Sequence, residues 1–351
     1  MKRFFFSAIA LMVAATACTE SGLIDTPDMY GSAIVFDTYL GKTPVTKAQN
    51  MGIDNLKSSY DDKGGAHLYS FMSTDNVVDY TSAFMNGNLG WDSSKSVWNY
   101  QISSDEGKTW ETEEVYWPGD VDLVFAAYNL AADDCITGRS LTGFDFTIQD
   151  DIADQVDLLA TPLTLVRESV NSDTSVGLTF YHLLSRVGFS VIATDPSDQV
   201  SITIQSLRLC GVFPKKGKVD LTASTSRPSI EAYTTDKATG YDLFATGEYC
   251  TKVTSVCGST ATEDSRIFAD NGEKDERFMM LMPGQLDGAK IEVMYQLSGA
   301  DPQFGTVDLG NIHLKAGCAY EFVLEVATSA IKFSGVVEGD WDEQPDTDIP
   351  Y

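Results

Sequence analysis

Short runs in which hydrophobic and polar residues alternate recur along the whole chain, and such alternation is typical of half-buried β-strands. Between Ala319 and Val326, for example, Tyr320, Phe322 and Leu324 fall on one face. Six other runs are rich in Val, Ile, Phe, Tyr and Thr and are bounded by turn-forming residues. They are Ala33–Leu40, Val121–Tyr128, Gln155–Ala160, Val187–Ala193, Val200–Cys210 and Lys290–Leu297. The chain is therefore expected to consist mainly of short strands.

Helical spacing is rare in this sequence. Short helices are expected only at Thr46–Ser58 and Phe180–Arg186. Because strands do not alternate with long amphipathic helices, a parallel α/β sheet is disfavoured. Many short strands at turn-rich spacing instead predict an all-β protein made of antiparallel β-sandwiches.

A chain of 351 residues is long enough for two domains. The loop Arg167–Ser175 is rich in small and polar residues and separates two strand-rich halves. We therefore expect an N-terminal sandwich over residues 32–170 and a C-terminal sandwich over residues 171–351. The turn-forming stretch Asp195–Asp198 is a competing boundary.

The N-terminus has the pattern of an export signal. Lys2 and Arg3 precede an apolar run from Phe4 to Ala17, and its roughly fourteen residues are too few to span a bilayer as a helix. Cys18 follows Ala15-Thr16-Ala17, which resembles a lipobox except that Ala15 replaces the usual larger aliphatic residue. Residues 1–17 are thus expected to be a signal peptide, Cys18 the lipidation site and residues 18–31 a tether to the outer membrane. An ordinary signal peptide beside an incidental cysteine is the alternative.

The chain is strongly acidic, with 51 Asp and Glu against 24 Lys and Arg and a net charge of −27. Removal of residues 1–17 would take away two cations and no acid. Such a charge disfavours binding to polyanions, so nucleic acid is not an expected partner. Because the acids are spread along the chain, most of them are expected on a solvated surface.

The sequence holds no recognisable catalytic or metal-binding constellation. Its three histidines, His67, His182 and His313, are far apart, and it has no glycine-rich phosphate loop and no Cys-x-x-Cys motif. His182 is interpreted as a buried residue that holds a backbone group. Two acidic clusters are interpreted as solvated loops: Asp150, Asp151, Asp154 and Asp157, and Asp340, Asp342 and Glu343. We therefore expect no enzyme activity, cofactor or metal, although a hydrolase with two spatially paired carboxylates stays open as an alternative.

Two tryptophans are candidates for ligand contact. Trp91 and Trp110 lie in the Gly-, Asn-, Asp- and Ser-rich stretch Asn86–Glu113, which is expected to form a long loop or loose hairpins. Exposed aromatic rings there would stack on sugars, whereas Trp98 is expected in the core. This predicts an alternative function, a monomeric glycan-binding protein of the cell surface.

Five cysteines follow Cys18: Cys135, Cys210, Cys250, Cys257 and Cys318. Because their number is odd, at least one is unpaired within the chain. Most are expected to be buried thiols, and a hairpin bridge between Cys250 and Cys257 is the alternative.

Six aromatic or apolar segments follow one another in a characteristic order over most of residues 33–341. They are Ala33–Phe36 with Thr46–Ala48; Trp98–Tyr100 with Tyr116–Pro118 and Leu123–Tyr128; Asp157–Ala160; Leu178–Val187; Leu281–Pro283 with Ile291–Tyr295; and Gly317–Tyr320 with Ile331–Trp341. Their order and spacing resemble the fimbrillin-like family of bacterial surface lipoproteins. The resemblance implies pilin-type subunits built from two transthyretin-like β-sandwiches in tandem.

The resemblance also implies assembly with other pilin subunits by strand exchange. A protease removes the first strand, here Ala33–Leu40 with Ile34 and Phe36, and a strand from a neighbouring subunit fills the groove. The donor would be Ala330–Val337, whose apolar contacts come from Ile331, Phe333, and Val336 or Val337.

One departure from the family pattern concerns the cleavage site. The best-known members are cut after an arginine, but this chain has no arginine between Arg3 and Arg139. The junction after the first strand offers only Lys42 and Lys47, and Lys47 is the candidate maturation site. A chain cut there suits a stalk or tip subunit, whereas an uncut chain suits an anchor or accessory protein. Either role implies adhesion at the cell surface or fimbrium to a glycan or protein on a host or bacterial surface.

Overall fold

The computed structural model describes residues 30–40, 53–58, 64–103, 109–119, 121–166, 175–193, 200–223, 227–254, 265–270, 274–327 and 330–340. Over these residues the chain is almost entirely β-structure, which confirms the all-β prediction. Helical turns there are short and include α1 (Ile53–Leu56), Leu130–Cys135 and Ile152–Asp154. In these parts of the chain no helix has both the length and the apolar character needed to cross a membrane.

The helix expected at Phe180–Arg186 is wrong. β14 (Val176–His182) and β15 (Ser185–Ala193) occupy this stretch instead. Val176, Leu178 and Phe180 are fully buried while the residues between them are not. This period of two is that of a half-buried strand, and the apolar residues that follow belong to the next strand.

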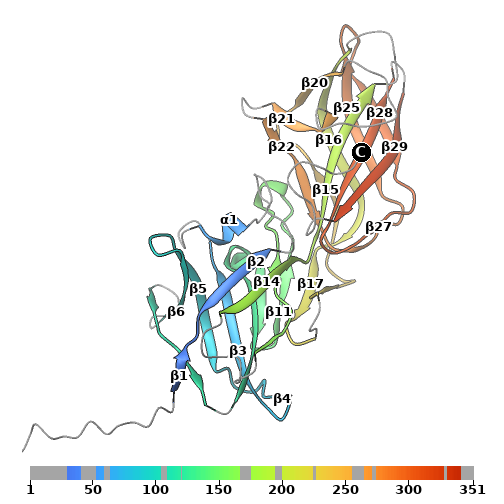
Figure 1. Cartoon of the computed structure of the whole chain (residues 1–351). Helices are drawn as coiled ribbons and strands as arrows, with labels where there is room; N and C mark the ends of the chain where they lie inside the picture. The colour runs from blue at the N-terminus through green and yellow to red at the C-terminus, as the bar shows by residue number, and fades with distance from the viewer. Residues whose placement is uncertain are drawn as a thin grey trace, which may run out of the picture.

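A ten-stranded sheet forms most of the N-terminal half (Figure 1). Its members are β13 (Thr164–Val166), β9 (Asp122–Asn129), β12 (Leu159–Ala160), β14, β2 (Phe36–Leu40), β6 (Val97–Ser103), β5 (Met85–Asp92), β3 (Ala66–Thr74), β4 (Val77–Val78) and β7 (Trp110–Thr112). Because β9 also pairs with β3, the path β9-β12-β14-β2-β6-β5-β3 closes on itself. The closed sheet encloses an aromatic core that includes Phe36, Trp98, Trp117, Phe125 and Phe180.

Two sheets form the C-terminal half. One contains β19 (Lys237–Asp242), β16 (Val200–Pro214), β25 (Lys290–Leu297), β26 (Gln303–Asp308) and β20 (Cys250–Thr254). The other contains β23 (Phe278–Leu281), β15, β28 (Cys318–Val326) and β29 (Ile331–Asp340), with β15 and β28 parallel. Phe189 and Phe322 of the second sheet share one core cluster with Ile291 and Tyr295 of the first.

A four-stranded sheet joins the two halves. β10 (Ile136–Ser140) and β11 (Gly143–Thr147) come from the N-terminal half, and β17 (Lys216–Asp220) and β18 (Ile230–Ala232) from the C-terminal half. β11 pairs with β17 along its whole length. β14 begins after the boundary expected near residue 170, yet it pairs with β2 and β12. The chain therefore passes from one half to the other at Leu183 and Leu184, both fully buried.

The remaining strands form three two-stranded pairs. They are β1 (Tyr30–Ala33) with β8 (Tyr116–Pro118), β21 (Phe268–Asp270) with β22 (Lys274–Glu276), and β24 (Gly284–Gln285) with β27 (His313–Leu314).

Candidate functional site

The strand β2 forms the second part of the predicted removable segment Ala33–Leu40, and alternate side chains insert it into the N-terminal core. Phe36 and Leu40 are buried, whereas Val35 and Tyr39 are 49% and 52% exposed. The Phe36 ring meets the Phe125 ring edge-on, with centroids 5.8 Å apart, and Trp117 meets Phe125 in the same way at 6.1 Å. The alternation seen in the sequence thus separates a core face from a solvent face.

Main-chain pairing makes β2 a link in the closed sheet. It runs parallel to β14 from Phe36 opposite Val176 to Leu40 opposite Phe180. On its other side, Phe36 lies opposite Trp98 of β6. Ile34 packs against the same core, and its backbone N–H donates a hydrogen bond to the Val115 carbonyl oxygen at 2.8 Å. Without β2, β14 would lose a parallel partner along five residues, and β6 would lose its pairing at Trp98.

The predicted donor segment forms strand β29, which lies at the edge of its sheet. It pairs with β28 from Ile331 opposite Val326 to Asp340 opposite Cys318. Ile331 and Phe333 pack against the C-terminal core, and the Phe333 ring lies 6.0 Å from the Phe322 ring in an edge-on contact.

Val336 and Val337 continue β29 beyond a register shift opposite Val323 and Leu324. Val336 is 38% exposed and Val337 is half-buried. The four apolar side chains of the predicted donor therefore lie along one edge strand, which leaves its outer edge available for further pairing.

Trp91 and Trp110 are both half-buried. The stretch that contains them forms β5, β6 and β7 in its described parts, and each strand pairs antiparallel with the next. Of the two expected forms, the hairpins are present there and the long loop is wrong. The ring centroid of Trp91 lies 5.3 Å from that of Trp98, and the Lys57 ammonium group lies 4.5 Å above the Trp91 ring. Trp98 itself is a core residue, 5% exposed.

His182 and Asp157 form a fully buried pair. His182 Nδ1 lies 2.6 Å from Asp157 Oδ2, and neither side chain is exposed to solvent. Asn129 fixes the same turn, because its Nδ2 donates to the Asp157 carbonyl oxygen and its Oδ1 accepts from Leu159 N–H. The interpretation of Asp157 as a solvated loop acid is therefore wrong, and His182 faces a carboxylate where a backbone group was expected.

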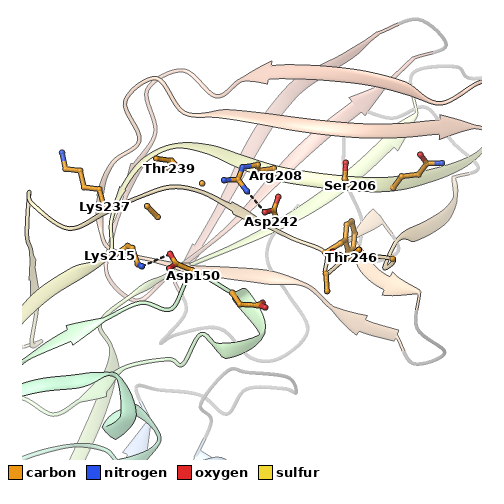
Figure 2. A pocket seen from close by; sticks show the side chains of 15 residues that line it. Asp150, Ser206, Arg208, Lys215, Lys237, Thr239, Asp242 and Thr246 are labelled. Atoms are coloured by element: carbon orange, nitrogen blue, oxygen red, sulfur yellow. Dashed lines mark hydrogen bonds and ion pairs between the residues drawn. The ribbon is translucent and has the colours of Figure 1, made fainter.

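A polar cavity of about 1030 Å³ lies where the loop after β11 meets the sheet of β16 and β19. Lys215 Nζ is 2.7 Å from Asp150 Oδ1, and Arg208 pairs with Asp242 (Figure 2). The sequence analysis did not identify this cavity. Its lining comes from residues near 150, from β16 and from residues 237–247, and no spacing in the sequence connects them.

The predicted lipidation site, the predicted maturation site and one of the cysteines lie outside the described residues. Cys18, Lys47 and Cys257 belong to segments that the structure does not describe. Cys135 and Cys250 are buried, and Cys210 and Cys318 are half-buried. Among the described residues, no group of three or more His, Cys, Asp or Glu side chains is arranged to hold a metal ion.

The sequence of this chain matches a family model described as fimbrillin-like over residues 71–341. Its fold is similar to the crystal structure of a fimbrial protein from Bacteroides vulgatus ATCC 8482, with a TM-score of 0.56 at 16% identity, covering 88% of this chain and 99% of that one. The crystal structure of a candidate cell adhesion protein from Bacteroides uniformis ATCC 8492 gives a TM-score of 0.49 at 11% identity, covering 88% of this chain and 98% of that one. No curated protein sequence matches the chain.

Proposed function

This chain belongs to the fimbrillin-like family, and on that premise we propose that it is a fimbrial subunit or accessory protein that serves cell adhesion. In this proposal the chain is exported as a lipoprotein through Cys18 and assembles with other subunits by donor-strand exchange. Its place is the cell surface or a fimbrium, and its partners are other pilin subunits.

The position of β2 is the observation that carries the proposal. It completes the closed sheet by linking β14 to β6, and Phe36 fills the core against Phe125. Loss of β2 would leave two sheet edges unpaired and would expose an apolar groove. A strand from a second copy would pair with the open edges through main-chain hydrogen bonds, and its alternate apolar side chains would fill the groove.

The position of β29 suits a donor. It is the last described strand, it occupies a sheet edge, and it presents Ile331 and Phe333 at alternate positions. An edge strand is held by hydrogen bonds on one side only, so it exchanges partners more readily than a strand inside a sheet. The same spacing of apolar side chains would fill the groove that β2 leaves in a neighbour.

The maturation step decides between two roles within this proposal. Cleavage at Lys47 would release β2 together with the lipid-bearing segment and produce a stalk or tip subunit. Retention of β2 would keep the groove closed and the lipid attached, which suits an anchor or accessory protein. Intact-mass analysis of the protein from its native membrane distinguishes the two, because the mass begins either at acylated Cys18 or near Ala48.

Assembly is tested with two forms of the purified chain, one beginning at residue 18 and one at Ala48. We expect the shorter form to produce a ladder of oligomers in size-exclusion chromatography, while the longer form stays monomeric. Phe333→Asp in the shorter form should abolish the ladder, because a buried charge cannot fill an apolar groove. A shorter form that folds and remains monomeric at all concentrations would contradict strand exchange.

Glycan binding through Trp91 and Trp110 stays a prediction. In this alternative function, which the sequence analysis predicted, the chain is a monomeric surface protein that binds glycans. The contacts of the Trp91 ring with Trp98 and Lys57 support packing more directly than ligand stacking. Loss of sugar binding on Trp91→Ala and Trp110→Ala would support this alternative, and glycan arrays without signal would end it.

A further inference from the structure

The polar cavity between the loop after β11 and the sheet of β16 and β19 has the properties of a ligand site. We propose that it binds a short glycan that carries a carboxylate group. Its volume of about 1030 Å³ lies at the upper end of the range of roughly 300–1,000 Å³ typical of small-molecule sites. It is thus large enough for a few sugar residues.

The first argument is the balance of charges around the cavity. Three basic residues, Arg208, Lys215 and Lys237, line it together with three acidic ones. In the whole chain, acids outnumber bases by 51 to 24. The cavity wall is therefore enriched in cations, which makes it a place where an acidic group meets less repulsion than over most of the chain.

The second argument is the arrangement of two ion pairs. Lys215 is 17% exposed and is held by Asp150, whose side chain is 78% exposed. Arg208 is held in the same way by Asp242, which is 61% exposed. Each pair offers a hydrogen-bond donor beside an acceptor, and adjacent sugar hydroxyls need both. Figure 2 shows both pairs among the side chains that line the cavity.

The third argument concerns Lys237, the remaining cation of the wall. It is exposed at the start of β19 and, within the described parts of the chain, makes no ion pair. The Thr239 side chain is exposed on the same strand. An exposed ammonium group that pairs with no carboxylate of the described residues is suited to a carboxylate from outside the protein.

Gly240 helps to place the guanidinium group of Arg208 against the strand. A Cβ atom at this position would lie 2.5 Å from the Leu209 carbonyl oxygen and 3.1 Å from Arg208 Nε. Glycine therefore allows the guanidinium to lie close to the backbone of β19. The wall is preorganised in this respect, which reduces the cost of ordering it around a ligand.

The remaining lining favours a hydroxyl-rich ligand over an apolar one. Ser206 and Thr246 are exposed and face the cavity, whereas the one aromatic residue of the lining, Phe244, is 8% exposed. A long polyanion would be repelled by the net charge of −27, so a short chain with few acid groups fits best.

This inference deepens the proposed adhesive function, because it names the class of ligand that the surface protein would hold. The binding test uses the chain from residue 18 onward, which includes every described residue and does not need to polymerise. If no glycan binds to the cavity, the result of the assembly experiment does not change. If the chain does not assemble, glycan binding to the cavity can still be measured.

The experiment is isothermal titration calorimetry with digalacturonic acid and 3′-sialyllactose as carboxylated probes, and lactose as the neutral control. We expect at least one carboxylated probe to bind with a Kd on the order of 1 mM or tighter, and lactose to bind at least tenfold more weakly. Lys237→Ala should weaken binding by about tenfold, the effect of one charged hydrogen bond, and Lys237→Glu should abolish it.

Lys218→Ala is the matched control, because Lys218 is an exposed lysine of β17 that does not line the cavity. It should bind like the unmodified chain, and circular dichroism should show that all variants fold. The proposal is overturned if neither carboxylated probe binds at about 10 mM, if lactose binds equally well, or if Lys237→Ala leaves the affinity unchanged.

Discussion

The ring of Phe36 meets the ring of Phe125 at an interplanar angle of 81°, with the centroids 5.8 Å apart. Phe36 belongs to a strand proposed to be removed, and Phe125 to the central strand β9 of the same sheet. This contact joins the first described part of the chain to the core. It shows that β2 is integrated into the N-terminal half by packing as well as by main-chain pairing.

Phe36→Ala should therefore destabilise the N-terminal half strongly. Loss of a buried Phe side chain leaves a cavity and costs about 3–5 kcal/mol in the free energy of unfolding. Urea denaturation followed by fluorescence measures this change. Tyr39→Ala, on the exposed face of the same strand, should cost less than about 1 kcal/mol. Equal losses for the two variants would mean that β2 is not docked through Phe36.

The buried pair of His182 and Asp157 leads to a second prediction. Asp157→Ala removes the partner of His182 Nδ1 inside the core, so it should cost about 1–3 kcal/mol in the free energy of unfolding, the penalty for a buried polar atom that loses its hydrogen bond. Asp154→Ala is the control, because Asp154 is an exposed acid of the same loop. Its cost should stay within about 0.5 kcal/mol.

A double-mutant cycle then tests whether the two residues act together. We expect the double variant Asp157→Leu with His182→Leu to be more stable than the sum of the single effects predicts, because no polar group is left buried. Strictly additive losses would show that His182 and Asp157 are not coupled.

The environment of His67 predicts a loss of stability in mild acid. Burial lowers the pKa of His67 below its ordinary value of 6.5, and hydrogen bonds with Asn88 and Asn86 oppose this shift only in part. Between the folded and the unfolded pKa, the unfolded state binds more protons, so stability falls as the pH drops below about 6.5.

Urea denaturation at pH 7 and pH 5 measures this dependence. His67→Gln cannot take up a proton in this range, so its stability should change less between the two pH values than that of the unmodified chain. His313→Gln serves as the control, because His313 is an exposed histidine. If the stability of His67→Gln depends on pH in the same way as that of the unmodified chain, protonation of His67 does not cause the loss of stability in acid.

Alternation along the sequence was sufficient to predict several of the long strands, because burial on one face is a local property of the sequence. The run Lys290–Leu297 coincides with β25, and Ala319–Val326 lies within β28. In β16 the buried residues Ile204 and Leu207 are three positions apart, because a register shift between Ile204 and Ser206 inserts an extra residue.

Features that depend on distant segments could not be predicted in this way. Asp157 is buried because His182, twenty-five positions away, faces its carboxylate. The cavity exists because β11 pairs with β17 and brings Asp150 to Lys215. Neither relationship leaves a periodic signal. The prediction of a solvated acid is correct for Asp150, whose side chain is 78% exposed, and wrong for Asp157.

Contact between β26 and β29 provides a test of how firmly the proposed donor strand is held. A Cβ atom added at Gly305 would lie 2.3 Å from Cγ2 of Ile331, a distance too short for two carbon atoms. Gly305→Ala should therefore displace Ile331 and weaken the docking of β29. Hydrogen exchange followed by mass spectrometry should show faster exchange in residues 331–337, with the rest of the C-terminal half unchanged.

Gly335→Ala is the matched control, because Gly335 lies in β29 itself and a Cβ atom there has no neighbour within 4 Å. Its exchange should match that of the unmodified chain. If β29 is the donor, Gly305→Ala should also speed oligomer formation by the form that begins at Ala48, since release of the strand precedes its insertion into a neighbour. Faster exchange without faster assembly would show that release of β29 does not limit assembly, and unchanged exchange would show that Ile331 is not a docking contact.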